Sequence, residues 1–189
     1  WYIFYHRHTN GTWFSRQGCA EKLPIREDGL FGQAELTSCG LNGGPLAGEG
    51  YYPSCIACHL FTDRPVIYVG DSDKPEYVNG SFPKIVKEGW DGDQNEGYIT
   101  NMYDQCTAGF RYFDLSHVSE ITLTIRGYAY GSMEIRTSFE GSAVKTIPLH
   151  YSNIWRDIKT EIKLPEGADS LYFTYRGPGS ASFKGFTLK

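Results

Sequence analysis

The 189-residue sequence lacks the roughly 18-residue apolar run that a membrane-spanning helix needs. It also lacks the 3.6-residue apolar period that predicts an amphipathic helix over ten or more positions. Charge of one sign does not dominate, because 18 basic and 22 acidic side chains leave a net charge of −4. This balance argues against a nucleic-acid partner, whose phosphates are bound by clustered Lys and Arg. Intrinsic disorder is excluded by 40% hydrophobic and 15% aromatic residues.

The cysteine pattern favours buried thiols over a disulfide scaffold or a metal site. The five cysteines are an odd number in a chain of ordinary domain size, whereas disulfide scaffolds are short and have even counts. Cys55-Ile56-Ala57-Cys58 has the CxxC spacing, but no second CxxC or paired-histidine motif accompanies it. We therefore favour reduced cysteines in the core over redox or zinc chemistry. This usage favours a reducing, cytoplasmic compartment and leaves secretion open.

The abundant feature of the sequence is alternation of apolar and polar residues, punctuated by 22 glycines and 9 prolines. Apolar side chains occupy every second position in residues 121–126, 158–164 and 171–176, which is the period of a half-buried strand. Turn signals such as Pro165-Glu166-Gly167 and Gly177-Pro178-Gly179 separate such runs. The pattern predicts an all-β fold, with a β-sandwich over residues 65–189.

Residues 1–64 predict a separate unit. Strand-like runs occur at 1–5, 12–16 and 33–38, with a hairpin turn signal at Asn10-Gly11 and a glycine-rich stretch at 39–50. Three or four antiparallel strands match one blade of a β-propeller; alternatively, they extend the sandwich. The chain opens on apolar residues with no methionine and no basic flank, so we expect it to be a piece of a longer protein.

Two groups of motifs resemble known families. The first group is Phe4-Tyr5-His6-Arg7, Ser15-Arg16-Gln17-Gly18-Cys19-Ala20-Glu21 and Leu36-Thr37-Ser38-Cys39-Gly40-Leu41-Asn42-Gly43-Gly44-Pro45-Leu46. It resembles the last blade of the five-bladed propeller in glycoside hydrolase family 43, the β-xylosidase and α-L-arabinofuranosidase group. The second group is Gly97-Tyr98-Ile99-Thr100-Asn101-Met102, Ala108-Gly109-Phe110-Arg111-Tyr112-Phe113-Asp114, Leu171-Tyr172-Phe173-Thr174-Tyr175-Arg176-Gly177 and Gly179-Ser180-Ala181-Ser182-Phe183. It is similar to a carbohydrate-binding module of family 6, a jelly-roll sandwich of the galactose-binding-like type.

The first resemblance implies the C-terminal, non-catalytic portion of an enzyme that hydrolyses O-glycosyl bonds in xylan or arabinoxylan. Such enzymes invert the glycosidic bond with two carboxylates, which the family carries on earlier blades. We therefore assign no catalytic residue and expect this chain to be catalytically silent. The acidic residues of the first segment are interpreted as solvated surface charges: Glu21, Glu27, Asp28, Glu35 and Glu49.

The same resemblance places three basic side chains near the propeller axis, namely His6, Arg7 and Arg16. His6 is interpreted either as a hydrogen-bonded structural histidine or as a group near a structural metal or water. Arg7 and Arg16 either hold a sugar hydroxyl or pair across blades. The expected partners are the missing propeller blades of the parent chain and a plant cell-wall oligosaccharide or polysaccharide.

The second resemblance predicts a sugar-binding cleft with aromatic walls. Its candidate residues are Trp155, Tyr98, Trp90, Tyr103, Asn95 and Lys184. Trp155 and Tyr98 match the two walls, although Trp155 can instead cap the sandwich and Tyr98 can belong to the core. Ser182 and Lys184 stand where the family has asparagines that bind the sugar. Two functions therefore stay open, a carbohydrate-binding module and a purely structural sandwich that braces the propeller.

One short segment resembles a calcium loop. Residues 91–95 read Asp-Gly-Asp-Gln-Asn, and calcium prefers oxygen ligands at alternate positions. Glu96 replaces the glycine that an EF-hand needs, and Met102 stands at the position of the bidentate glutamate. We interpret the segment as a solvated acidic turn. No metal ligand and no cofactor are assigned, calcium being the one ion left open.

Overall fold

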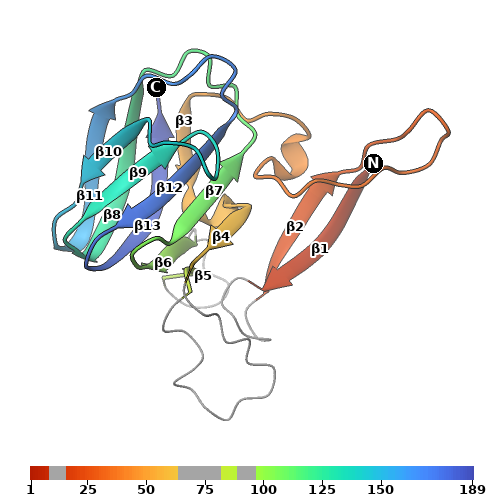
Figure 1. The fold of residues 1–189 in the computed structure, drawn as a ribbon. Coiled ribbons are helices and arrows are strands. Elements are labelled where there is room, and N and C mark those ends of the chain that lie inside the picture. The colour runs from red at the N-terminus through yellow and green to blue at the C-terminus, as the bar shows by residue number, and fades with distance from the viewer. Residues whose placement is uncertain (9–15, 64–81, 89–96) are drawn as a thin grey trace, which may run out of the picture.

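The structure, a computed structural model, describes residues 1–8, 16–63, 82–88 and 97–189. Strands account for nearly all of its regular structure, which confirms the all-β expectation (Figure 1). In chain order the elements are β1 (Tyr2–His8), β2 (Arg16–Lys22), the 3-10 helix η1 (Gly40–Asn42), β3 (Gly50–Pro53), the 3-10 helix η2 (Ser54–Ile56), β4 (His59–Phe61), β5 (Lys84–Val86), β6 (Tyr98–Met102), β7 (Thr107–Arg111), β8 (Glu120–Ala129), β9 (Ser132–Arg136), β10 (Lys145–Pro148), β11 (Ser152–Glu161), β12 (Ser170–Arg176) and β13 (Gly179–Leu188). None of the helices in the described residues is long and apolar enough to cross a membrane.

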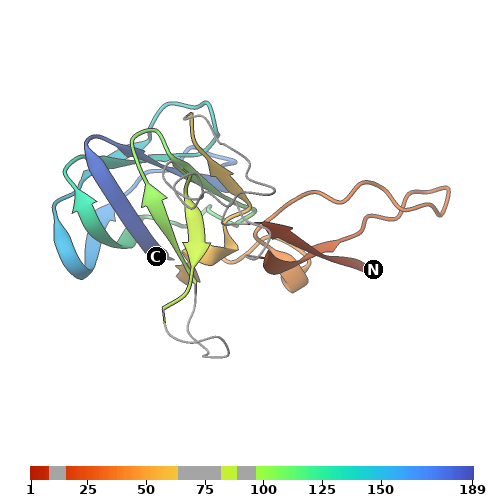
Figure 2. The same ribbon diagram turned by 90° about the horizontal axis from the view of Figure 1, so that it is seen from below.

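Two antiparallel sheets form the sandwich (Figures 1 and 2). One sheet has the order β10-β9-β12-β7-β4, and the other has the order β11-β8-β13-β6-β5, with β3 also paired to β13. The alternating sequence explains these strands. In β8, Ile121, Leu123 and Ile125 are buried, while Thr122 and the residues that alternate with it lie on the outer face.

The core between the sheets is aromatic. Phe110, Phe173, Phe183 and Phe186 are all fully buried, and Phe186 has its ring centroid 5.0 Å from those of Phe110 and Phe173. These residues come from β7, β12 and β13, so their rings join the two sheets directly. Burying each such side chain contributes roughly 1.5–3 kcal/mol.

The N-terminal hairpin stands beside the sandwich (Figure 1). Strands β1 and β2 pair antiparallel from Tyr2↔Lys22 to His8↔Arg16 and form a sheet of their own. The strand expected at the start of the chain is therefore present and longer than predicted. The turn signal at Asn10-Gly11 and most of the strand expected at 12–16 lie outside the described residues.

Two expectations for the first 64 residues need correction. Strands β3 and β4 lie before residue 65 but pair with β13 and β7, so the sandwich starts earlier in the chain than expected. Residues 33–38 form no strand, because their polar groups bond to side chains and to β7 rather than to a neighbouring blade strand. Leu36 O accepts from Arg111 Nε at 3.0 Å, and Thr37 N donates to Glu21 Oε1 at 2.9 Å.

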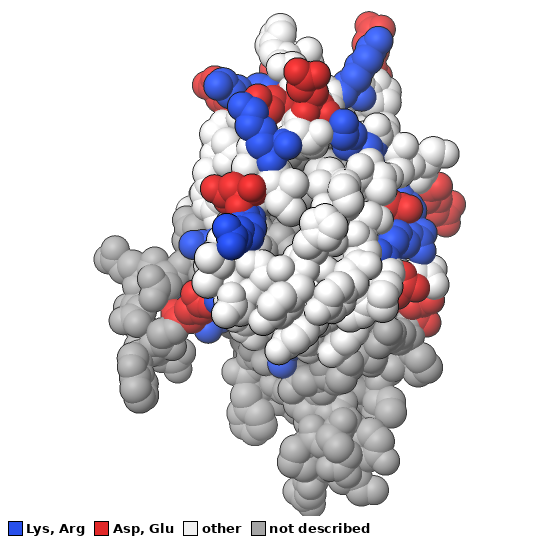
Figure 3. All heavy atoms as spheres, turned by 90° about the vertical axis from the view of Figure 1, so that its left-hand side faces the viewer, with Lys and Arg blue, Asp and Glu red and all other residues white. Residues whose placement is uncertain are grey.

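Charge is unevenly distributed over the side of the molecule that carries β10 and β11 (Figure 3). Charged side chains gather in the upper part and at the margins of this side and leave a broad uncharged area between them. A surface of this kind suits a neutral ligand better than an ionic one.

Candidate functional site

The two aromatic residues predicted to form a cleft meet on the outer face of one sheet. Trp155 belongs to the edge strand β11, and Tyr98 begins β6 in the same sheet. Their ring centroids are 5.2 Å apart and their planes are inclined at 80°, an edge-to-face contact. Both side chains are half-buried. The rings therefore touch one another rather than standing apart as two walls.

A bulge in β11 brings Trp155 to this position. Ser152 lies opposite Gly127 and Arg156 lies opposite Ile125, so three residues of β11 face a single residue of β8. The extra residues bend the edge strand and turn the indole over the sheet. The Trp155 Nε1 atom is buried and has no hydrogen-bond partner among the described residues.

Arg126 lies against both rings. Its Cζ atom is 4.2 Å from the centroid of Trp155 and 5.2 Å from that of Tyr98. One guanidinium nitrogen also donates to Tyr98 Oη at 3.1 Å and forms an ion pair with Glu88. A protein cation therefore packs against both aromatic rings at this point. Arg126 was not among the predicted site residues; the alternating run at 121–126 indicates that it points outward but not which residues it meets.

A hollow of about 440 Å³ opens beside Trp155 on the same sheet. It is lined by Tyr51, Thr122, Thr124, Trp155, Asp157, Lys184 and Thr187, which come from β3, β8, β11 and β13. Thr124 Oγ1 donates to Asp157 Oδ1 at 2.7 Å, and Lys184 Nζ lies 5.8 Å from the Trp155 ring centroid. The hollow combines two aromatic rings with hydroxyl, carboxylate and ammonium groups. Such a set can stack on the apolar face of a sugar and bond to its hydroxyls.

The remaining residues predicted for the cleft are not joined to this hollow. Tyr103 packs against the hydrophobic core in the turn between β6 and β7. Trp90, Asn95 and the calcium-like segment at 91–95 lie outside the described residues. Within the part of the chain that the structure describes, no group of three or more His, Cys, Asp or Glu residues could hold a metal ion.

The three residues predicted for the propeller axis lie on the hairpin. His6 is exposed on β1, and Arg16 begins β2 opposite His8. Arg7 donates to the carbonyl oxygen of Cys58 at 2.9 Å and to that of Ala57. Arg7 therefore ties the hairpin to the segment between η2 and β4 of the sandwich.

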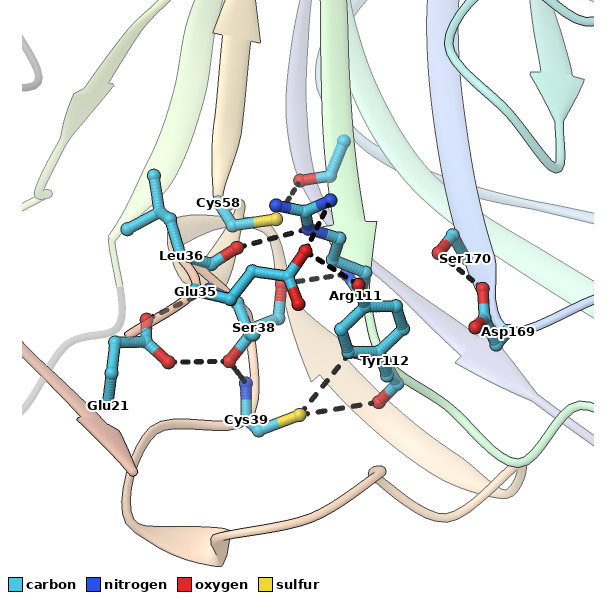
Figure 4. A network of polar contacts seen from close by, with 12 residues as sticks. Glu21, Glu35, Leu36, Ser38, Cys39, Cys58, Arg111, Tyr112, Asp169 and Ser170 are labelled. Atoms are coloured by element: carbon cyan, nitrogen blue, oxygen red, sulfur yellow. Dashed lines mark hydrogen bonds and ion pairs between the residues drawn. The ribbon is translucent and has the colours of Figure 1, made fainter. Parts of the chain in front are cut away.

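A polar network continues this junction (Figure 4). Glu35 forms an ion pair with Arg111 at 3.2 Å and accepts from Tyr112 Oη at 2.8 Å. Arg111 N in turn donates to Ser38 Oγ at 3.2 Å. The loop between the hairpin and the sandwich is thus fastened to β7 by several bonds at once.

The prediction that Glu21 is a solvated surface charge is wrong. Only 5% of Glu21 is exposed, and its carboxylate accepts from Thr37 N at 2.9 Å, Thr37 Oγ1 at 2.7 Å and Tyr5 Oη at 3.4 Å. Burial raises the pKa of Tyr5 to about 12, with Cys19 and the Glu21 carboxylate adding to the effect. A buried carboxylate requires such donors, and the loop at 33–38 supplies them.

The five cysteines are thiols rather than disulfides. Cys58 and Cys106 are buried and the other three are half-buried. Cys58 Sγ donates to Gly109 O at 3.4 Å, and burial raises the pKa of this thiol. A raised pKa disfavours the thiolate that redox and metal chemistry need. Cys58, the second cysteine of the CxxC segment, is thus a buried thiol with a raised pKa.

Comparison with known proteins supports the resemblance seen in the sequence. No protein-family model matches the chain. A xylosidase/arabinosidase from Thermoclostridium stercorarium is 51% identical over 188 residues, which span 100% of this chain and 39% of the relative. The resemblance to glycoside hydrolases of the xylosidase and arabinofuranosidase group is confirmed. The chain spans about two fifths of the length of this xylosidase/arabinosidase.

Solved structures show the same fold. A family 6 carbohydrate-binding module from Clostridium stercorarium, in complex with cellobiose, has a TM-score of 0.58 at 11% identity and covers 78% of this chain and 98% of its own. A family 43 arabinoxylan arabinofuranohydrolase from Bacillus subtilis, in complex with cellotetraose, has a TM-score of 0.58 at 15% identity. That match covers 100% of this chain and 38% of the hydrolase. The match to the hydrolase therefore extends over both the hairpin and the sandwich of this chain.

Proposed function

We propose that this chain is a non-catalytic part of a glycoside hydrolase acting on xylan or arabinoxylan, and that its sandwich binds a plant cell-wall saccharide beside Trp155. The observation that carries this proposal is the hollow itself, in which Trp155 and Tyr51 flank the Thr124–Asp157 pair and Lys184. The xylosidase/arabinosidase relative supports the substrate class. The catalytic carboxylates belong to a part of the parent protein that this chain does not contain.

The composition of the hollow fits a neutral sugar ring. An indole offers a flat apolar surface for the C–H face of a sugar, and Asp157, Thr122 and Thr187 offer acceptors and donors for its hydroxyls. Because Lys184 stands in place of an amide and the ammonium group only donates, the sugar orientation is weakly fixed. We expect a dissociation constant in the high micromolar to millimolar range, roughly −4 to −6 kcal/mol.

The hairpin is proposed to dock onto the remaining propeller blades of the parent protein. On β1, Phe4 is 71% exposed and Ile3 is 40% exposed, and Trp1 beside them is 76% exposed. The β1–β2 sheet has only two strands, so both of its outer edges lack a strand partner among the described residues. Exposed apolar side chains and open edges favour addition of further strands.

The second candidate function is a structural brace without sugar binding. It is favoured by the junction, where Arg7 and Arg111 fasten the hairpin and the loop to the sandwich. It is also favoured by the packing of Arg126 and Tyr98 against Trp155.

Calorimetric titration of xylohexaose into the wild type and Trp155→Ala, together with thermal melting, separates the two candidates. Binding predicts that Trp155→Ala weakens the wild-type affinity at least tenfold, because stacking residues at the centre of a site typically contribute about 2 kcal/mol. Phe139→Ala, which removes an exposed aromatic residue in the turn after β9, is the control and should bind as the wild type does. If the wild type gives no heat signal and Trp155→Ala costs about 3–5 kcal/mol of stability, the structural brace is the better account.

A further inference from the structure

Three tyrosines gather on the surface at one end of the sandwich. Tyr128 is 66% exposed, Tyr130 is 60% exposed and Tyr151 is 47% exposed. Tyr151 is the central ring, with its centroid 5.0 Å from that of Tyr128 and 6.4 Å from that of Tyr130. The rings of Tyr130 and Tyr151 are inclined at only 11°. Aromatic rings gathered in solvent mark an interaction surface, and we call these three residues the tyrosine cluster.

The backbone beneath the tyrosine cluster is firmly held. Tyr130 N donates to Tyr175 Oη at 3.1 Å, and Tyr175 Oη donates to Pro178 O at 2.5 Å. Leu149 N donates to Gly131 O at 2.8 Å, which fastens the turn before β11 to the turn after β8. At Gly131 a Cβ atom would lie 1.8 Å from Arg176 O, so only glycine allows this close approach of the turns. The rings are therefore presented by a preorganised frame, which lowers the entropic cost of binding.

Charged residues border the turns of the tyrosine cluster but lie outside them: Asp104 Oδ1 accepts from Gly177 N at 2.8 Å, and Arg176 precedes Gly177. Residues 127–132, 147–155 and 177–182, which contain the three turns at this end and the adjoining strand ends, include no Asp, Glu, Lys or Arg. An anionic or cationic ligand would find no counter-charge in these turns. A neutral ligand with apolar faces and many hydroxyls matches them, because tyrosine offers both a ring and a hydroxyl.

The tyrosine cluster and the hollow beside Trp155 are close along the chain. Tyr151 precedes the bulge of β11 and Trp155 lies within it, four residues further along the chain. Ser152 Oγ donates to Ile154 O at 2.6 Å and fixes the connection between them. We therefore expect a chain-like ligand to reach both surfaces, whereas a short oligosaccharide can fill only one.

We propose that the tyrosine cluster is a second saccharide-binding surface, which takes a neutral polysaccharide chain. The ligand class rests on the proposed function, but the residues that bind are separate from the hollow. Two linked contacts strengthen the binding of a polymer without changing the affinity for a short sugar. The tyrosine cluster should therefore matter for arabinoxylan and not for xylotriose.

The test measures depletion of the protein by insoluble arabinoxylan beside calorimetric titration with xylotriose. We expect the triple variant Tyr128→Ala/Tyr130→Ala/Tyr151→Ala to bind the polymer at least tenfold more weakly than the wild type, and to bind xylotriose within twofold of it. The matched control is Phe4→Ala/Phe31→Ala/Phe61→Ala, which removes three other exposed aromatic rings and should bind the polymer as the wild type does. If the triple variant melts early, Tyr151→Ala alone removes the ring that contacts both others and should weaken polymer binding at least threefold.

Failure of this proposal is distinguishable from failure of the proposed function. The proposal of a second surface is overturned if the tyrosine variants bind the polymer as the wild type does. It is also overturned if the control variant loses as much polymer affinity as they do. Both outcomes hold whatever the effect of Trp155→Ala. If the tyrosine variants lose polymer binding while Trp155→Ala binds xylotriose as the wild type does, the tyrosine cluster is supported as a binding surface. The hollow is then rejected as a sugar site. Sedimentation analysis tests the remaining occupant, a second copy of this chain. A wild-type dimer that the triple variant abolishes would overturn the proposal.

Discussion

The guanidinium of Arg126 packs against the indole of Trp155, with its Cζ atom 4.2 Å from the ring centroid. The same side chain bonds to Tyr98 and pairs with Glu88, so four residues from separate segments converge at this point. Trp155 is therefore held by the protein while it also lines the hollow. An aromatic ring that is already fixed loses little conformational entropy when a sugar stacks on it.

The contact between Arg126 and Trp155 should be measurable as a coupling free energy. In a double-mutant cycle with Arg126→Met and Trp155→Ala, we expect about 1 kcal/mol of coupling in the free energy of unfolding by urea. Lys184→Met is the matched control, because Lys184 Nζ lies 5.8 Å from the same ring and should couple less. Simple additivity of the Arg126 and Trp155 changes would contradict the contact.

The buried carboxylate of Glu21 should hold the hairpin to the rest of the protein. In Glu21→Ala, Thr37 N and Tyr5 Oη lose their acceptor, and an unsatisfied buried group costs about 1–3 kcal/mol. Hydrogen exchange of the amides in β1 and β2 should therefore become faster, while that of β8 and β13 stays unchanged. Glu27→Gln alters an exposed carboxylate nearby and should leave the hairpin as it is. Equal protection of the hairpin in both variants would refute this role.

The Glu134 carboxylate should make the stability of the sandwich sensitive to acid. Burial raises its pKa, but hydrogen bonds from Arg136 and Arg176 outweigh burial and leave the pKa below the ordinary 4.5. As the pH falls, the unfolded chain takes up the proton first. The contribution of Glu134 is therefore full above about pH 4.5 and is lost as the pH falls through the lowered value.

Urea unfolding at pH 7 and pH 3 tests this dependence. We expect Glu134→Gln to destabilise the protein at pH 7 and to differ little from the wild type at pH 3. Glu140→Gln, at an exposed position in the following turn, should have no effect at either pH. If Glu134→Gln lowers the free energy of unfolding as much at pH 3 as at pH 7, its effect comes from a change of side-chain shape rather than from loss of the charge.

The isolated chain should hydrolyse no aryl xyloside or aryl arabinofuranoside. The two carboxylates that inverting hydrolysis needs are proposed to lie elsewhere in the parent protein. Glu21 is bonded to Thr37 and Glu35 is paired with Arg111, so neither carboxylate is left to activate water. Release of nitrophenol that scales with protein concentration and survives repurification would show that a catalytic pair is present here.

The sequence was most informative where the pattern is local. Alternation predicted β8 and β11, because a strand with one covered face repeats every second residue. It also predicted β12, although that strand is buried on both faces from Ser170 to Tyr175. The loop at 33–38 was mistaken for a strand, because its partners are the distant Glu21 and Arg111, which no local period reveals. The burial of Glu21 was not predicted for the same reason, because it depends on Thr37 and Tyr5, which lie far from it in the sequence.

The candidate site likewise contains residues that local motifs reveal and residues that they do not. Trp155 and Tyr98 could be named from motifs, and the structure brings their rings into contact. Arg126 and Tyr51 could not be assigned to the site from motifs. Their positions there depend on pairing between strands that are far apart in the sequence. Sheet register, rather than residue type, decides which side chains share an outer face.

Chemical-shift mapping of the isotopically labelled protein with xylohexaose is the most direct test of saccharide binding beside Trp155. The account predicts that the largest changes fall on the indole N–H of Trp155 and on the amides of Thr124, Asp157 and Lys184, and that they are absent in Trp155→Ala. Changes confined to the opposite sheet, or no changes at millimolar sugar, would contradict it.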